Sequence, residues 1–226
     1  MLPIEVPRFA ILFGRGGSSR YDGSMPAIGI TGGVSTGKST FCEFLREILP
    51  NAKFFDADRA AHDLVDIEEV KQELTKEFGF TIFLPNGGLN RAALRAIVFQ
   101  DVAKRRVLEK ILHPRIRREW SIEADKHRTS PEFFFADIPL LYETDGQTLC
   151  DRVVVVASSP RIQLANLIRK MKIEQPAAEA IIKSQMPLED KIKRADHVVW
   201  NNSNRSVLAN QAANLVKLWQ QEKWTK

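Results

Sequence analysis

An apolar run that leads directly into a glycine-rich turn constrains this chain more than any other feature. Residues 27–31, Ala-Ile-Gly-Ile-Thr, are followed by Gly-Gly-Val-Ser-Thr-Gly-Lys-Ser at 32–39. After the turn, apolar residues recur at helical spacing: Phe41, Phe44, Leu45, Ile48 and Leu49. A strand, a tight turn and an amphipathic helix therefore follow one another, which is the context that a phosphate-binding loop (P-loop) of the pattern G-x-x-x-x-G-K-S requires.

The residue types of this turn have a chemical reason. Glycines allow the backbone to fold so that successive N–H groups face a phosphate, and the following helix offers its positive N-terminal end. Lys38 is expected to neutralise the β- and γ-phosphates of ATP, and Ser39 to ligate Mg²⁺. An ordinary glycine-rich turn with a surface lysine is the alternative, but it does not explain why a strand precedes the turn and an amphipathic helix follows it. The residues expected to bind ATP here are Gly32, Gly33, Ser35, Thr36, Gly37, Lys38, Ser39 and Thr40.

The composition is that of a soluble globular protein. The 226 residues, of which 44% are hydrophobic and 27% charged, suffice for one sizeable domain or a core with an inserted subdomain. The longest apolar runs, such as 153–157, have the length of a strand and not of a membrane span. The net charge of +5 is dispersed along the chain, which favours polyanionic small molecules over nucleic acid as partners. We expect a monomer or a weak homo-oligomer.

The cysteines and histidines show no metal-binding spacing. Cys42 and Cys150 lie far apart, so a reducing, cytoplasmic location is the simple inference, with Cys42 as a small packing residue. The four histidines form no H-x-x-x-H pair, and no zinc site is expected.

Strand-length apolar runs alternate with helical patterns from Met25 onwards. The runs are apolar throughout instead of alternating with polar residues, which predicts a parallel sheet covered on both faces and hence a three-layer α/β fold. The candidate strands are 27–31, 53–55, 133–138, 152–157 and 197–200.

Helical patterns fill the remaining chain. The stretch of about 62–128 is too long for one crossover and predicts an inserted helical region, in which Pro114 is expected to end one helix and start the next. Two helices, 161–172 and 177–185, are expected around Pro176, and a last helix is expected to pack on the core.

Residues 1–24 differ from the rest of the chain. They contain a polar, glycine-rich tract with several arginines, and we expect a flexible extension ahead of a domain at 25–226. A targeting segment and a start codon assigned too early are both open explanations, and the second is preferred.

Carboxylates follow two of the candidate strands. Asp56 and Asp58 come directly after residues 53–55, at the sheet edge where parallel sheets bind ligands, and strand alternation would place both on one face. Asp58 is the candidate base for an acceptor hydroxyl, with Asp56 either supporting it or capping the next helix. Asp137 ends an apolar strand and is expected to be linked to magnesium, although an acid there can also meet only solvent or a helix terminus.

Several motifs occur in one order along the chain and together resemble the dephospho-CoA kinase family. The resemblance implies transfer of the ATP γ-phosphoryl group to the ribose 3′-hydroxyl of dephospho-CoA, the last step of coenzyme A biosynthesis. It also implies a five-stranded parallel core, a helical CoA-binding region at about 62–128 and a lid at about 161–185. The motifs are T-G-G-V-S-T-G-K-S-T at 31–40, D-A-D at 56–58, G-L-N-R-A-A-L at 88–94, L-H-P at 112–114, I-P-L-L-Y-E at 138–143, Gln185, Ala195-Asp196 and Asn201.

The resemblance also implies residue roles. Asp58 takes the position of the catalytic aspartate and Lys38 that of the loop lysine, while Thr31 lies beside the acceptor. His113 and Leu140, with Leu141, would shape the acceptor pocket, although packing is the simpler role for the leucines.

The lid departs from the family pattern. Asn166 stands where an arginine is usual, and Lys170, followed by Met171, stands in the place of the arginine of an R-D pair. Lysine keeps the charge and loses the bidentate fork, so Arg169 or Lys170 is expected to bind ATP in a different way.

Three other functions are compatible with parts of the sequence. Another small-molecule P-loop kinase, acting on a nucleoside or nucleotide, would use the same loop. A nucleotide-dependent regulatory or nucleic-acid-binding module would agree with the excess of basic over acidic residues. A catalytically weakened relative of the family would agree with the altered lid.

Overall fold

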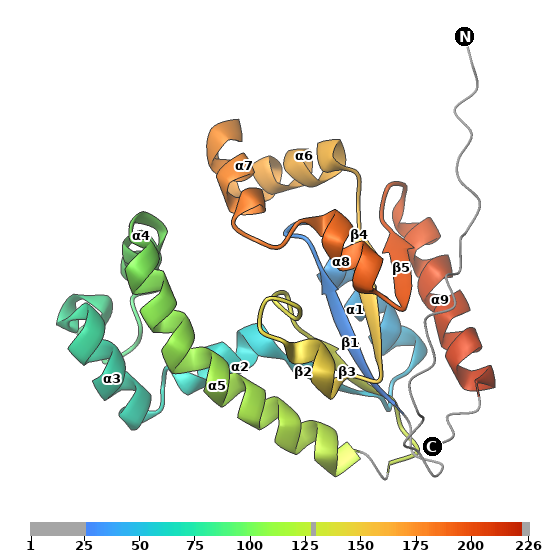
Figure 1. Cartoon of the computed structure of the whole chain (residues 1–226), viewed down its shortest axis with the longest axis horizontal. Helices are drawn as coiled ribbons and strands as arrows, with labels where there is room; N and C mark the ends of the chain where they lie inside the picture. The colour runs from blue at the N-terminus through green and yellow to red at the C-terminus, as the bar shows by residue number, and fades with distance from the viewer. Residues whose placement is uncertain (1–25, 128–129, 223–226) are drawn as a thin grey trace.

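The computed structural model describes residues 26–127 and 130–222, and the extension expected at 1–24 lies outside them (Figure 1). The described residues form a five-stranded sheet in the order β2-β3-β1-β4-β5, and every pair of neighbours is parallel. This confirms the predicted fold class and all five candidate strands to within a residue or two. The strands are β1 (Ala27–Gly32), β2 (Lys53–Asp56), β3 (Phe134–Asp137), β4 (Arg152–Ala157) and β5 (His197–Trp200).

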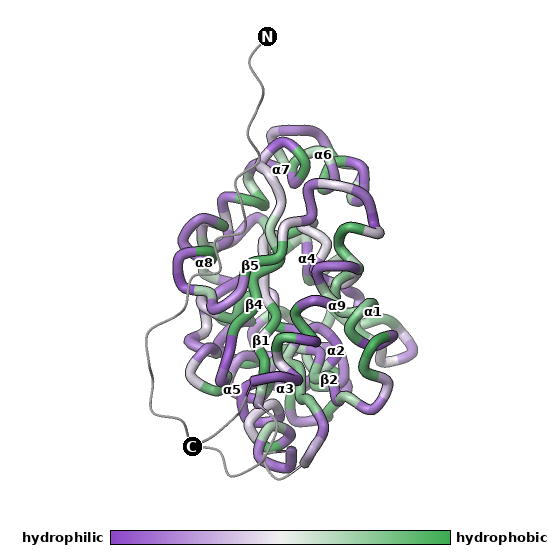
Figure 2. Tube along the Cα trace, turned by 90° about the vertical axis from the view of Figure 1, so that its right-hand side faces the viewer, coloured by the Kyte–Doolittle hydropathy of each residue, from purple (hydrophilic) through white to green (hydrophobic). Residues whose placement is uncertain are grey.

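Helices cover both faces of the sheet. Alternate strand residues such as Ile28, Ile30 and Val154 pack against α1 (Lys38–Ile48) and α9 (Arg205–Gln221). The residues between them, such as Val153 and Val155, pack against α2 (Ala57–Leu64), the second half of α5 (Val102–His127) and α8 (Leu188–Arg194). Figure 2 shows the apolar strands in the middle of the molecule and polar residues along the outer helices. The apolar runs are therefore buried on two sides, as a parallel sheet requires.

The chain between β2 and β3 forms a helical region with a core of its own. It contains α3 (Glu68–Phe78), the short 3₁₀ helix η1 (Phe80–Ile82), α4 (Arg91–Gln100) and the first half of α5. Figure 1 places α3 and α4 to the left of the sheet. The core of this region consists of Val65, Val70, Leu74, Phe78, Ile82, Leu94 and Ile111.

The prediction that Pro114 separates two helices is wrong, because α5 continues through it. Proline lacks the N–H that would bond four residues back, so a local rule predicts a break. Instead, α5 joins two cores: Ile111 belongs to the core of the helical region, whereas Trp120 and Ala124 belong to the sheet core. Arg115 also donates from Nη1 to the carbonyl oxygen of Ile111 at 2.7 Å. Tertiary packing on both sides of the proline thus maintains the helix.

The chain after β4 continues in α6 (Pro160–Met171) and α7 (Gln175–Lys183), drawn above the sheet in Figure 1. The two helices are separated at Lys172, whose φ of 53° is left-handed, and Pro176 lies in the first turn of α7. A second 3₁₀ helix, η2 (Gly146–Leu149), precedes β4. In the described part of the chain, no helix is long and apolar enough to cross a membrane.

Candidate active site

The P-loop closes tightly at the carboxyl end of β1. Thr36 donates to the carbonyl oxygen of Gly33 from its backbone N (3.3 Å) and from its hydroxyl (2.9 Å). Gly37 has a φ of 100°, and a Cβ there would collide with the amide nitrogen of Asn201. That amide Nδ2 donates to the carbonyl oxygen of Thr36 at 3.0 Å. Gly37, the second glycine of the motif, is therefore required both by its backbone conformation and by the lack of room for a side chain.

The loop ends where α1 begins, at Lys38. The first N–H groups of a helix have no partner within the helix, and Gly37 supplies no side-chain cap. Ser35 has a φ of 59°, which is unusual for a residue with a side chain and marks a sharp turn of the loop backbone. Ser39 is exposed in the first turn of α1 and Thr40 is half-buried. Free amides at a helix N-terminus form a site for an anion such as a phosphate.

Lys38 and Asp137 form an ion pair beside the loop, between Nζ and Oδ1. The sheet register explains their proximity, since Asp137 pairs with Ile30 of β1 on one side and with Asp56 of β2 on the other. The Cys42 thiol lies 3.5 Å from the other Asp137 oxygen. Burial, and then the Asp137 charge, raise the pKa of Cys42, which keeps it a buried thiol and agrees with its predicted packing role.

Asp58 lies in the first turn of α2, so the expectation that strand alternation places it beside Asp56 is wrong. The chain leaves the strand at Asp56 and is helical from Ala57 onwards. The carboxylate is nevertheless part of the same group of charges. Burial raises the pKa of Asp58, Lys38 lowers it, Asp56 and Asp137 raise it, and Lys170 lowers it. The Asp58 carboxylate is therefore within electrostatic range of the Lys38–Asp137 ion pair at the carboxyl edge of the sheet.

We expect the pKa of Asp58 to lie above its ordinary value of 3.8, because the surrounding protein keeps water from part of the carboxyl group and so disfavours its charged form. Carboxyl ¹³C NMR of the wild type, with Asp58→Asn to assign the signal, measures it. Lys38→Met should raise this pKa further, since it removes a cation, and Asp137→Asn should lower it, since it removes an anion. A pKa at or below 3.8, or shifts in the opposite directions, would contradict this electrostatic account.

Asp56 caps α2, which confirms the capping alternative. Its Oδ1 accepts a hydrogen bond from the backbone N of Arg59 at 3.0 Å. The same bond explains why the chain enters the helix so early, because a capped N-terminus stabilises the first turn.

Replacing this cap should affect stability more than catalysis. For Asp56→Ala we expect the free energy of unfolding to fall by about 1 kcal/mol in urea denaturation, the usual effect of losing a cap. Asp56→Asn should recover most of it, because an asparagine oxygen also caps. Unchanged stability in Asp56→Ala would show that the bond contributes nothing.

The four residues expected at the acceptor lie at different depths. Asp58 faces the charged group described above, whereas Thr31 is fully buried and donates its hydroxyl to the carbonyl oxygen of Pro139 at 3.0 Å. Leu140 is half-buried in the loop after β3, and its neighbour Leu141 is buried in the core. His113 lies on α5, where burial lowers its pKa and Glu109 of the same helix raises it.

Comparisons with known proteins identify the family of the chain. The family model described as dephospho-CoA kinase matches residues 26–206. A curated dephospho-CoA kinase of Fusobacterium nucleatum is 39% identical over 181 residues, which cover 80% of this chain and 92% of that protein. The chain belongs to the dephospho-CoA kinase family. It is therefore a kinase, and its P-loop is the nucleotide-binding loop of that enzyme class.

Solved structures share this fold. TT1252 from Thermus thermophilus has a TM-score of 0.71 and 28% identity, covering 88% of this chain and all of that one (100%). The dephospho-CoA kinase from Campylobacter jejuni has a TM-score of 0.61 and 24% identity, covering 85% of this chain and 96% of that one, which bears on the fold alone.

The residues expected in the lid that depart from the family pattern lie on α6. Asn166 reaches the P-loop, where its Nδ2 lies 3.5 Å from the carbonyl oxygen of Ser35, and its Oδ1 accepts from Arg169 at 3.0 Å. Lys170 acts on Asp58 electrostatically. The two cations therefore differ in surroundings. Arg169 is connected to the loop through Asn166, and the charge of Lys170 lowers the pKa of Asp58.

Helix α8 and its Lys191 are not among the predicted elements and site residues, whereas Glu143 and Gln185 beside them belong to the quoted motifs. Lys191 is completely buried on this helix. A signal was present, because Leu188, Lys191, Ile192 and Ala195 have the spacing i, i+3, i+4 and i+7 of one helix face. A lysine among apolar residues on the inward face predicts a buried, paired charge.

Proposed function

We propose that the protein transfers the γ-phosphoryl group of ATP to the ribose 3′-hydroxyl of dephospho-CoA, giving coenzyme A and ADP. The observation that carries this proposal is the Lys38–Asp137 ion pair at the P-loop of a dephospho-CoA kinase family member, with Asp58 within electrostatic range of it. In this reaction the 3′-oxygen forms a bond to the γ-phosphorus and the bond to the β–γ bridging oxygen breaks. The 3′-hydroxyl and the γ-phosphoryl group need to be positioned, and no covalent intermediate with the protein is required.

The P-loop would hold the triphosphate. Backbone N–H groups around Ser35–Thr40 would face the phosphate oxygens, with Gly32, Gly33 and Gly37 allowing the close approach. Lys38 would leave Asp137 for the β- and γ-phosphates, because a polyphosphate carries more negative charge than one carboxylate. The net charge of +5 suits two polyanionic substrates.

Asp58 would orient the acceptor. Its carboxylate would accept the proton of the 3′-hydroxyl while the oxygen attacks, a role that typically contributes about 10²–10⁴-fold to the rate. A raised pKa makes this carboxylate a better base than an ordinary aspartate. Thr31, through Pro139, together with Leu140 and His113 would shape the acceptor pocket. The helical region of about 62–128 would contact the rest of dephospho-CoA.

The site suits magnesium bound largely by substrate. In the described part of the chain, no three His, Cys, Asp or Glu residues form a metal cluster. Mg²⁺ at kinase sites usually has one or two protein ligands together with phosphates and water. Ser39, exposed in the first turn of α1, and Asp137 would hold it. When bound, the ion would neutralise charge on the β- and γ-phosphates.

The lid, at about 161–185, would close over ATP with Arg169 and Lys170 as its cations. Asn166 holds Arg169 near the loop, and Lys170 lies within electrostatic reach of Asp58.

We also propose a cytoplasmic location, since Cys42 and Cys150 are both free thiols, as expected in a reducing compartment.

An acceptor panel tests the proposal. Purified protein with ATP and Mg²⁺ is offered dephospho-CoA, adenosine, AMP and shikimate separately, and ADP release is followed. We expect release with dephospho-CoA at least about 10²-fold faster than with any other acceptor, the level of discrimination that specific hydrogen bonding provides. A faster reaction with a nucleoside or nucleotide would favour the other small-molecule kinase.

A further inference from the structure

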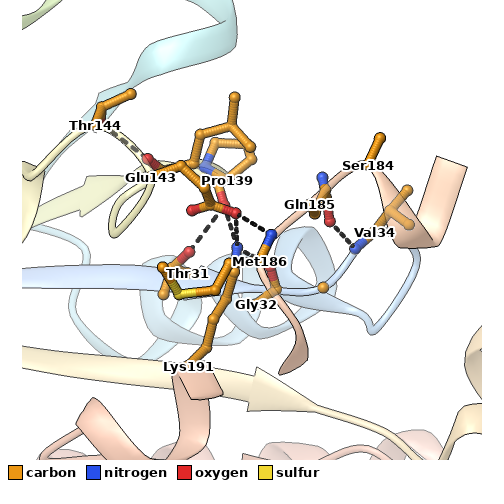
Figure 3. Close-up of polar contacts among 12 residues, drawn as sticks. Thr31, Gly32, Val34, Pro139, Glu143, Thr144, Ser184, Gln185, Met186 and Lys191 are labelled. Atoms are coloured by element: carbon orange, nitrogen blue, oxygen red, sulfur yellow. Dashed lines mark hydrogen bonds and ion pairs between the residues drawn. The ribbon is translucent and has the colours of Figure 1, made fainter. Parts of the chain in front are cut away.

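A buried ammonium group joins three segments that surround the proposed reaction centre. Lys191 of α8 is fully buried, and its Nζ contacts three oxygens (Figure 3): the carbonyl oxygen of Gly32 at 3.3 Å, that of Pro139 at 3.0 Å, and Oε1 of Glu143 at 2.8 Å. An ammonium group has three donors, so each hydrogen has an acceptor. The three segments are the start of the P-loop, the loop after β3, and α8.

The partners of Lys191 extend the connection to the end of the lid. Glu143 also accepts from the backbone N of Met186 at 3.0 Å, through the oxygen that binds Lys191. Next to Met186, Gln185 accepts from the backbone N of Val34 at 2.9 Å. Figure 3 shows these side chains converging between the loop and the turn that follows α7. We call Val34, Glu143, Gln185, Met186 and Lys191 the hinge cluster.

The other end of the lid contacts the same peptide of the P-loop. Gln163, in the first turns of α6, donates from Nε2 to the carbonyl oxygen of Val34 at 3.0 Å. Gln163 and Gln185 therefore bind the two polar backbone groups at Val34 from the two ends of the α6–α7 segment. If the loop moves on binding phosphate, these two hydrogen bonds would transmit the movement to both ends of the α6–α7 segment.

We propose that Lys191 is a positioning residue for phosphoryl transfer, and that the hinge cluster couples the lid to the P-loop. This inference rests on the proposed function for its effect on turnover. Lys191 is completely buried and would act through the backbone groups that it contacts. It holds the carbonyl oxygens of Gly32 and Pro139 on one ammonium group, so that the phosphate loop and the acceptor-side loop keep a fixed separation. Misplacement of reacting groups by about 1 Å can cost about 10²-fold in rate.

Two variants, each with a matched control, test this role. Lys191→Met removes the ammonium group but keeps an unbranched side chain only one atom shorter, and Lys193→Met removes a 73% exposed lysine of the same helix. Gln185→Leu removes the contact with Val34, and Gln175→Leu removes a surface contact with Glu179 elsewhere in the segment. Circular dichroism establishes which variants are folded, and Gln185→Leu decides the question if Lys191→Met does not fold.

The expected result separates positioning from stability. Lys191→Met and Gln185→Leu should lower kcat at least about tenfold per folded molecule while the KM for ATP changes less than about threefold, and both controls should match the wild type. A lower Tm with wild-type kcat and KM would overturn the inference, because a merely structural role predicts that pattern.

Hydrogen exchange gives a readout that does not need the acceptor. ATP should slow amide exchange in residues 160–185 of the wild type, and Gln185→Leu should lose most of this response although it still binds ATP. If the wild type forms no coenzyme A, the proposed function fails, and the exchange experiment still decides the coupling. An ATP response in Gln185→Leu equal to that of the wild type would overturn it.

Discussion

Asp58→Asn is expected to lower kcat by about 10²–10⁴-fold with the affinity for ATP little changed. The amide has nearly the shape of the carboxylate, but it cannot take the proton of the acceptor hydroxyl. Lys38 and Asp137 remain in place, so the phosphate loop keeps its ion pair. Initial rates of ADP release at saturating dephospho-CoA give kcat, and calorimetric titration gives the Kd for ATP.

Asp63→Asn is the matched control for this experiment. Asp63 lies on the same helix, its side chain is 67% exposed, and it pairs with Arg59 at 3.8 Å. We expect wild-type turnover from this variant, because a single exposed ion pair contributes little. Wild-type turnover from Asp58→Asn itself would remove Asp58 from the mechanism.

Lys38→Met should reduce kcat/KM for ATP by about 10²–10³-fold, the usual cost of losing one group that stabilises developing charge. Two effects act together. The variant removes the cation that the phosphates would meet, and it leaves the carboxylate of Asp137, only 7% exposed, without that partner and facing the triphosphate. Steady-state kinetics over a range of ATP concentrations measures the loss.

Adding Asp137→Asn to Lys38→Met separates these two effects. If repulsion by the unpaired carboxylate contributes, the double variant should bind ATP without Mg²⁺ more tightly than Lys38→Met alone. Lys53→Met, at the exposed start of β2, is the control and should behave as the wild type. Near-normal kcat/KM in Lys38→Met would contradict the assignment of Lys38 to the phosphates.

The sheet was predictable from the sequence because its strands are buried on both faces. The run at 153–157 contains no polar residue, so it is recognisable as a buried strand. The P-loop pattern also indicates where β1 ends and α1 begins. The proximity of Asp137 to the loop also followed from the sequence, because parallel strands end at one edge.

The elements that were mispredicted depend on contacts between distant segments. Pro114 is a helix breaker by local rules, and only the two cores that α5 joins explain the continuous helix. The position of Asp58 depended on one side-chain cap at Asp56, which moved the start of α2 forward. The partners of Lys191 lie 159 residues away at Gly32 and 52 residues away at Pro139, and no local pattern connects them.

Direct identification of the product tests the central claim. The protein is incubated with Mg²⁺, ATP and dephospho-CoA, and the products are quantified by mass spectrometry and ³¹P NMR. We predict one coenzyme A, phosphorylated on the ribose 3′-oxygen, for each ATP converted to ADP. Folded protein that binds ATP but yields no coenzyme A, or that places the phosphate on another atom, would contradict the account.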